Sequence, residues 1–507
     1  MLLIHGKGSA PGEWLRLRKL LSKIEFKAPA RLRFAALLIT GWPFSMPGDP
    51  SKGLLPSSND ATFGRLACPS LTRLNLKERK SEPLLLRSIE IESTKHWKYN
   101  LKSDLHWWSG KSVTGKDLTQ FISEQICAAA SSSVGKEVAC PKHEIRDATE
   151  PSRAGQAPSA RVIWQTTPSF GPYVMNEVPF ARSSGESGFE CAGLYRYRVA
   201  ASGSAELVPA PGYQQKRPVL QIEPAGGRRQ KSRSHVDFTF GSAMQSGQFC
   251  SREALVPSVI GILWSEGDDG APGAKALSAP VRKALTQLLP RGELLRAGAL
   301  GLGDLVTSFI PRQHPGYNQS LRIRPYSVEE ASLALEKAGW QRMKADSPRV
   351  DKKTGKPVVL EFLIQEPGSA GADLLQKVIS DSLALLGIQA EFTTRDTGSI
   401  DGVIGNFYVE WPDWNLLRGD RQGTLARRFI QSAFFQQQEI QRLFRQYSQS
   451  LSTATPDFMS LQRFHEKLYE AEVFSPVFQM GSCLDRSAHA PAKLDFTDPD
   501  WLRQLVL

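Results

Sequence analysis

The sequence SVEEASLALEKAG at residues 327–339 opens the stretch that decides the fold, residues 321–416. Four further periodic segments follow it, namely PVVLEFLI (357–364), DLLQKVISDSLALLG (373–387), IQAEFT (388–393) and DGVIGNFY (401–408). Ser327 and Glu330 form a capping box, the apolar residues behind them recur at helical spacing, and Gly339 stands where a helix ends. A helix is therefore predicted over about 327–338.

The other segments predict strands that alternate with a second helix. Residues 357–364, 388–393 and 401–408 are rich in strand-forming residues, and 373–386 returns to helical spacing. Strands joined through a helix lie parallel with a right-handed crossover, so an α/β fold is predicted. Ligands of such sheets bind outside the carboxyl ends of the strands. The acidic-aromatic run Val409–Trp414 follows such an end and is the predicted ligand site.

Four segments of the chain resemble, in the expected order, the motifs of a known family. Leu101–Asp117 is similar to "LR…W.DG.P.TA.D", Pro280–Leu285 to "VRQAL", Tyr326–Trp340 with Gly355–Pro357 to "Y…A…LL…AGW…GKP", and Asp401–Asp413 to "D…G…ADYPDP". The family that these segments resemble is the peptide-binding type of ABC-transporter solute-binding proteins, called solute-binding protein family 5.

Weaker similarities extend the resemblance over roughly residues 60 to 485. They are Cys191–Tyr195 for the family's "GTGPY", Pro211–Tyr213 with Arg217–Pro218 for "N..Y…..RP", and Pro311–Tyr317 for "P…PGY". The chain also departs from the family, because Trp414 stands where a proline is usual and the usual opening segment has no clear match. The resemblance therefore supports the family's fold for this chain more strongly than it supports the family's ligand.

The resemblance implies a two-lobed, periplasmic-binding-protein-like fold of type II, with mixed sheets and a hinge between the lobes. A chain of 507 residues is long enough for more than one hydrophobic core. We expect an N-terminal extension at 1–50, lobe I at 51–252, lobe II at 253–470, and a return to lobe I at 471–507. Composition shifts near 265–273 and at Phe474–Pro476 support the two crossing points.

The resemblance also implies a function, that of a receptor that closes on a small solute and delivers it to an ABC importer. Glu410 matches the acidic residue of "ADYPDP", which receives the free amine of a peptide in the family. A peptide or another amine-bearing solute is therefore expected. Asn406, Phe407 and Tyr408 precede Glu410 on the strand that lends backbone groups to an extended peptide in the family. The alternative for Glu410 is a solvated acid at a strand end.

Aromatic residues complete the predicted ligand-binding set. Trp411 and Trp414 are expected to form apolar walls, with core packing as the alternative for Trp411. Asp413 is included, although a turn or capping role is the alternative. In the earlier motif, Trp107 is predicted to lie in the core, and Trp108 is a pocket candidate.

The amino end of the chain allows two interpretations. Residues 34–44 form an apolar run of roughly ten residues behind Arg31 and Arg33, which is typical of an export signal and too short to span a bilayer. No clean cleavage site follows, so a strand or an unrelated extension is the alternative. With an export signal, the resemblance implies a periplasmic or cell-envelope location.

The net charge of +12 raises the question of an acidic partner. Outside the cluster at 16–33 the basic residues interleave with acidic ones, and no nucleic-acid-binding motif accompanies them. A solvated basic surface is expected, nucleic acid is not expected as a partner, and peripheral membrane association is allowed. The chain shows no nucleophile elbow, zinc-protease motif or phosphate-binding loop, so we expect no enzyme, no catalytic residue and no cofactor.

The six cysteines lie far apart in the sequence. They stand at 68, 127, 140, 191, 250 and 483, without the close paired spacing of a structural zinc site, so no metal is expected. Free, partly buried thiols are expected, and the alternative is a disulfide between Cys127 and Cys140 in an oxidising compartment. Residues 128–160 are rich in small and charged residues and are predicted to form a long surface loop.

The sequence therefore predicts a solute-binding receptor that works by hinge closure with the permease of an ABC transporter as its partner. A monomer is expected unless the protein belongs to a complex. One rival is an interaction protein that keeps the solute-binding fold without solute capture. The other rival is a hydrolase whose residues are too scattered to form a local motif.

Overall fold

The structure is a computed structural model, and it describes a large part of the 507-residue chain. The described residues are 36–42, 67–75, 77–134, 140–148, 157–176, 178–183, 189–199, 205–211, 219–224, 238–241, 253–266, 277–299, 303–344, 346–364, 370–395, 400–408 and 424–486. The chain divides into the units Met1–Ala35 and Ala36–Leu507, and every element named below belongs to the second unit.

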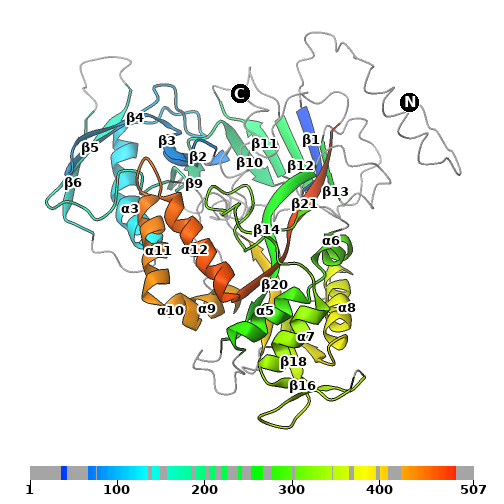
Figure 1. The fold of residues 1–507 in the computed structure, drawn as a ribbon. Coiled ribbons are helices and arrows are strands. Elements are labelled where there is room, and N and C mark those ends of the chain that lie inside the picture. The colour runs from blue at the N-terminus through cyan, green and yellow to red at the C-terminus, as the bar shows by residue number, and fades with distance from the viewer. Residues whose placement is uncertain are drawn as a thin grey trace, which may run out of the picture. The chain divides into compact units, whose positions relative to one another are not determined.

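Within the described ranges, eleven strands form one large mixed sheet in the order β10-β11-β12-β1-β13-β21-β14-β20-β18-β19, with β15 paired to β21 beside that path (Figure 1). The strands are β1 (Ala36–Trp42), β10 (Tyr195–Val199), β11 (Ala205–Pro209), β12 (Val219–Pro224), β13 (Phe238–Gly241), β14 (Glu253–Trp264), β15 (Gly303–Asp304), β18 (Val359–Ile364), β19 (Gln389–Thr393), β20 (Gly402–Tyr408) and β21 (Phe474–Arg486). The two longest, β14 and β21, pair with each other in the middle of this sheet.

These two long strands join the two parts of the sheet. On one side, β21 pairs with β13, and on the other side β14 pairs with β20. They begin at Glu253 and Phe474, close to the predicted crossing points at 253 and 471. The lobe boundaries themselves stay a prediction.

The predicted α/β segment is confirmed element by element. Helix α7 spans Val328–Lys337, and the hydroxyl oxygen of Ser327 accepts a hydrogen bond from the backbone N–H of Glu330 at 3.2 Å. Helix α8 spans Ala370–Ala384 and connects β18 to β19. Strand β18 runs parallel to both β19 and β20, as expected for strands joined through helices.

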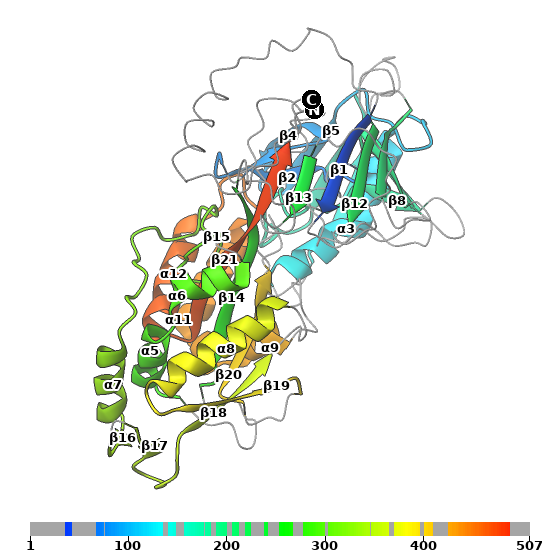
Figure 2. The same cartoon turned by 90° about the vertical axis from the view of Figure 1, so that its right-hand side faces the viewer.

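Side chains of the central strands alternate between two hydrophobic cores. On β14, Val259 and Leu263 belong to one core, whereas Ile262 and Trp264 belong to the other. Because successive side chains of a strand point to opposite faces, both faces of this part of the sheet are buried. Figure 2 shows α6 (Arg291–Ala299) and α8 in front of β14 and β20.

Helices cover both faces of the central strands. The core of Ile262 and Trp264 includes residues of α5 (Ala279–Gln287), α7 and α8. The core of Val259 and Leu263 includes residues of α9, α10, α11 and α12. Those four helices span Thr424–Gln431, Ala433–Gln436, Gln438–Ser450 and Phe458–Ala471.

A third core lies under a separate four-stranded sheet of order β4-β5-β7-β6. Its strands are β4 (Leu86–Ser93), β5 (His96–Leu101), β6 (His143–Asp147) and β7 (Ser159–Trp164), and α3 (Gly115–Val134) packs beside β6 and β7. Three further pairs are β2-β3 (Thr72–Asn75, Lys80–Pro83), β8-β9 (Ala181–Ser183, Phe189–Cys191) and β16-β17 (Trp340–Arg342, Arg349–Asp351).

The predicted surface loop at 128–160 is wrong in part. Helix α3 continues to Val134, and β6 occupies His143–Asp147. Only one of the five residues of β6 is apolar, so the strand has no alternating pattern. The strand forms because it pairs with β7, and this pairing cannot be read from the local sequence.

The apolar run near the amino end contains strand β1. Residues 36–42 lie parallel to both β12 and β13. This geometry agrees with the strand interpretation of that run, and an export signal there remains untested. In the described part of the chain, no helix has the length and apolar character needed to cross a bilayer.

Candidate functional site

The last residues of β20 form the centre of the candidate site because they have an open edge. On one side, Gly405–Tyr408 pair with Gly261–Ser258 of β14. On the other side, β18 pairs with Gly402, Val403 and Ile404 and ends there at Ile364. Among the residues that the structure describes, no strand pairs with Gly405–Tyr408 on this second side. An extended chain can add to such an edge through backbone hydrogen bonds.

The predicted ligand-binding residues lie on this edge or directly after it in sequence. Asn406, Phe407 and Tyr408 are the last three residues of β20 and pair with Ile260, Val259 and Ser258. Val409–Trp414, with the predicted site residues Glu410, Trp411, Asp413 and Trp414, lies outside the described residues. The roles of these side chains stay predictions.

A buried acid fixes where β20 begins. The Asp401 side chain is fully buried, and its carboxylate accepts a hydrogen bond from the backbone N–H of Glu361 on β18 at 2.9 Å. The Asp401 N–H donates to the Glu361 carbonyl, also at 2.9 Å, and the Asp401 carbonyl accepts from the N–H of Ser265 at 2.9 Å. Asp401 therefore ties β20 to β18 and to the end of β14. Sequence reasoning gave this residue no role, although it opens the "D…G…ADYPDP" match.

Trp107, in the segment Leu101–Asp117, lies in a hydrophobic core, as predicted. Trp107 is buried, and its indole N–H donates to the Asp117 carboxylate at 3.3 Å. Asp117 also accepts from the N–H of Thr114 at 2.8 Å, which makes a cap at the start of α3. Hydrogen bonds from Thr114 lower the pKa of Asp117 against the opposing effect of burial. Trp108 is 8% exposed and donates its indole N–H to the Ala67 carbonyl at 3.1 Å, so its place in the ligand site stays a prediction.

Arg282 holds the link between α12 and β21. Its guanidinium donates to the carbonyl of Ala471 at 2.8 Å and to that of Glu472 at 3.2 Å, and it pairs with Glu266 at 3.3 Å. Burial lowers the pKa of Arg282, and the two nearby carboxylates raise it. Arg282 lies in the segment Pro280–Leu285, which resembles the family's "VRQAL". It anchors the link between α12 and β21, close to the predicted second crossing point.

A buried histidine lies next to a threonine hydroxyl, but its protonation excludes a nucleophile-and-base pair. The Nδ1 atom of His465 accepts a hydrogen bond from the backbone N–H of Asn318 at 2.9 Å. The proton is therefore on Nε2, which donates to Thr307 Oγ1 at 3.1 Å. Thr307 Oγ1 in turn donates to the Tyr317 hydroxyl at 2.9 Å. Burial lowers the pKa of His465 to about 4, so the network is a neutral core element.

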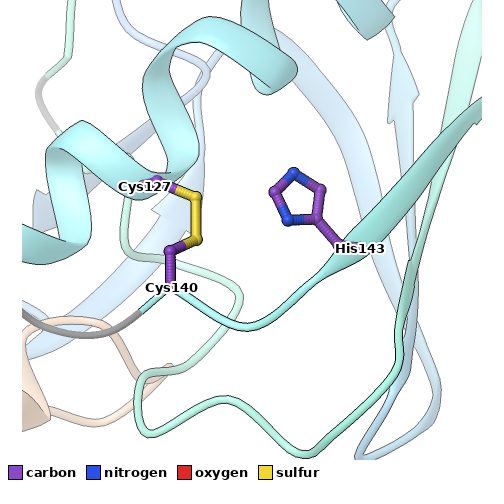
Figure 3. Close-up of side chains that lie close together, drawn as sticks. All are labelled: Cys127, Cys140 and His143. Carbon is purple, nitrogen blue, oxygen red and sulfur yellow. A yellow bond between two sulfur atoms is a disulfide. The ribbon is translucent and has the colours of Figure 1, made fainter.

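Cys127 and Cys140 form a disulfide, with 5.6 Å between the two Cα atoms, so the expectation of free thiols at these positions is wrong. Figure 3 shows the bond next to the ring of His143. One sulfur of each cysteine and one ring nitrogen of His143 lie within 4.8 Å of one another, a spacing suited to a metal ion. Both sulfurs are bonded to each other, so neither is available as a thiolate ligand. The sequence missed a second disulfide, Cys68–Cys191, whose partners stand 123 residues apart.

The chain is similar to one family model over part of its length. Residues 275–427 match the model described as bacterial extracellular solute-binding proteins, family 5 Middle. This range contains three of the four segments that resemble the family in sequence, from Pro280–Leu285 to Asp401–Asp413. None of the curated proteins matches the chain.

Solved structures with the same fold cover nearly the whole chain. NikA from Brucella suis in complex with Fe(III)-EDTA has a TM-score of 0.67 and 12% identity over 93% of this chain and 99% of its own. An ABC transporter substrate-binding protein from Sinorhizobium meliloti has a TM-score of 0.64 and 14% identity over 93% and 99%. The oligopeptide-binding protein AppA from Bacillus subtilis, in complex with a nonapeptide, has a TM-score of 0.58 and 12% identity over 92% and 97%.

These similarities agree with the predicted fold class. At 12 to 14% identity, the solved structures establish a shared fold and leave the solute open. Residues 275–427 are similar to the middle region of the family 5 solute-binding proteins, and the chain shares the α/β fold of the solved structures named above.

Proposed function

We propose that the protein is the solute-binding receptor of an ABC importer and captures a small peptide, or another solute with a primary amine, between its two lobes. The open edge of β20 at Gly405–Tyr408 carries the proposal, because it supports backbone pairing with an extended chain. Such pairing uses few side chains of the ligand, so the receptor tolerates different peptide sequences. The predicted partner is the permease of the transporter.

Glu410 gives the proposed site its polarity. It follows the last residue of β20 by two positions in the sequence, and we expect its carboxylate to pair with the amino group of a bound peptide. A charge pair in a cleft that excludes water is stronger than one on the surface, and removing one partner costs about 2 to 5 kcal/mol. Similarity to AppA, which was solved with a nonapeptide, supports a peptide as the solute.

A second candidate solute is a metal complex. NikA from Brucella suis, solved with Fe(III)-EDTA, has a TM-score of 0.67, against 0.58 for the peptide-bound AppA. A chelate of this kind carries carboxylate groups and needs no amine, so Glu410 would give it no favourable charge pair. Peptides and chelates can therefore be distinguished with the same protein.

Thermal melting of protein freed of carried-over ligand tests the proposal. Pools of dipeptides to pentapeptides are the first set, the same pools with acetylated amines are the control, and nickel with histidine is the third set. At one hundred times its dissociation constant a ligand adds about 2.7 kcal/mol of stability. We expect stabilisation by the free-amine pools alone. Stabilisation by the nickel complex alone would favour the second candidate, and none with any set would favour the interaction protein.

A further inference from the structure

A small cavity lies where the end of α12 meets the start of β21. Its lining comes from four chain segments, namely the first residue of α6, the loop before α7, the end of α12 and the beginning of β21. The cavity holds a particle of about the size of one water molecule. The lining residues are Arg291, Thr307, Arg324, Tyr469, Glu472, Phe474 and Pro476.

Arg291 brings a buried charge to this cavity. The residue is 6% exposed, and its Nε is buried without a hydrogen-bond partner. Within the described residues, no hydrogen bond or ion pair of its guanidinium is found. A buried cation without a partner is costly, and an unsatisfied buried group of this kind often marks a bound water or ion. Burial lowers the pKa of Arg291 to about 10, so the group stays charged at neutral pH.

Glu472, the acid in the lining of the cavity, is already paired with another arginine. Glu472 forms an ion pair with Arg324, whose guanidinium also donates to the Tyr469 carbonyl at 3.2 Å. Between Glu472 and Arg291 there is an electrostatic attraction, without a hydrogen bond or a close ion pair among the described contacts. With Arg291 and Arg324 against the single carboxylate of Glu472, the lining carries two positive charges and one negative charge. One positive charge is left without a counterion.

We propose that this cavity binds a small inorganic anion of halide size, such as chloride, held by the guanidinium of Arg291. The small size of the cavity favours a halide over the larger phosphate and sulfate ions. A water molecule fits, but it leaves the positive charge uncompensated in a buried site. The anion would join α6 to the link between α12 and β21. The proposal is independent of which solute the receptor captures.

Crystals of the full chain grown or soaked in sodium bromide give the direct test, because bromide replaces chloride and scatters X-rays anomalously. We expect an anomalous peak in the cavity within hydrogen-bonding distance of the Arg291 guanidinium. Ordinary density without an anomalous signal at this position, in crystals where bromide occupies surface sites, would identify a water molecule and overturn the proposal. This test needs no variant.

Thermal melting in two salts gives the test in solution. Sodium chloride and sodium gluconate at equal ionic strength screen charges equally, but gluconate is too large for the cavity. We expect the melting temperature in chloride to be higher by about 1–2 °C at ten times the dissociation constant. Equal melting temperatures in the two salts would contradict the proposal.

A matched pair of variants assigns the effect to this cavity. Arg291→Met removes the buried charge, and we expect it to abolish the difference between chloride and gluconate. Arg146→Met removes the same charge from an exposed side chain on β6, and we expect it to leave the difference unchanged. A difference that persists in Arg291→Met would place the anion elsewhere and overturn the proposal. If this variant does not fold, the bromide peak in the natural protein decides.

Discussion

Asp401 and Glu361 exchange two hydrogen bonds, each of 2.9 Å, at the point where β20 begins beside β18. This pair sets the register of the two parallel strands. With that register, β18 ends at Ile364 opposite Ile404, and Gly405–Tyr408 continue beyond it with one edge that no described strand covers. The open edge of the candidate site therefore depends on a buried acid several residues away from the predicted ligand contacts.

Replacing Asp401 tests this dependence. Asp401→Ala leaves the N–H of Glu361 and the surrounding polar groups without their partner, so we expect a loss of about 1–3 kcal/mol in the free energy of unfolding. Asp401→Asn keeps an oxygen acceptor and should lose less. Urea unfolding of the two variants gives the measurement. Equal stability of Asp401→Ala and the natural protein would show that the pair does not fix the strand.

Replacing Arg282 tests the anchor at the second crossing point. Arg282→Met leaves the carboxylate of Glu266 buried at 9% exposure, and the three backbone carbonyls of Leu277, Ala471 and Glu472 lose a donor. We expect a loss of about 3–5 kcal/mol, measured by urea unfolding. Arg282→Lys should restore little of the lost stability, because an ammonium group cannot reproduce the fork of guanidinium donors. Full recovery by lysine would mean that charge alone matters here.

Two buried histidines predict that the protein loses stability on mild acidification. Burial lowers the pKa of His314 to about 3 and that of His465 to about 4. Both are neutral in the folded protein, whereas the unfolded chain binds protons below about pH 6.5. The two neutral histidines therefore contribute their full share of the folding stability above about pH 6.5. This share declines as the pH falls toward the folded pKa values of about 4 for His465 and about 3 for His314. At pH 5 we expect a loss of about 2 kcal/mol for each histidine.

The variant His465→Gln isolates one of these histidines. Other groups titrate in the same range, and the raised pKa of Glu472, caused by burial, acts in the opposite direction. The unfolding free energies of the natural protein and the variant are therefore compared at pH 7 and at pH 5. The titration of other groups is the same in both proteins and cancels in the difference. We expect the stability advantage of the natural protein to shrink by about 2 kcal/mol. An advantage that stays constant would mean that His465 is not held neutral.

The two disulfides should contribute unequally to stability. Cys68–Cys191 closes a sequence separation of 123 residues and Cys127–Cys140 one of 13. In the chain-entropy account, losing these bonds costs about 5 and about 3 kcal/mol. The paired variants Cys68→Ser with Cys191→Ser, and Cys127→Ser with Cys140→Ser, give the comparison by urea unfolding. A larger loss for the short-range pair would contradict the loop-length argument.

The local fold around the candidate site could be predicted from the sequence because local patterns encode it. The capping box of Ser327 and Glu330 and the glycine after each helix predict the ends of α7 and α8 within about three residues. Strand β6 could not be predicted, because its pairing with β7 is set by contacts far apart in sequence. The partner of Cys68 was missed for the same reason.

The candidate site divides in the same way between local and distant information. Strand β20 and its position in the sheet follow from periodicity and from the rule for parallel crossovers. The roles of Asp401 in strand register and of Arg291 in the buried cavity depend on neighbours from other segments, which no local pattern reveals. The role of Glu410 rests on the resemblance alone.

The pairing of Glu410 with a ligand amine is tested most directly by titration calorimetry with one free-amine peptide and its acetylated form. The proteins are the natural chain, Glu410→Gln, and the control Glu391→Gln, which changes an exposed acid on the neighbouring part of the sheet. We predict that Glu410→Gln weakens binding of the free-amine peptide by at least about thirtyfold, equivalent to about 2 kcal/mol, with no effect of the control. Equal affinity of the natural protein and Glu410→Gln for the free-amine peptide would contradict the account.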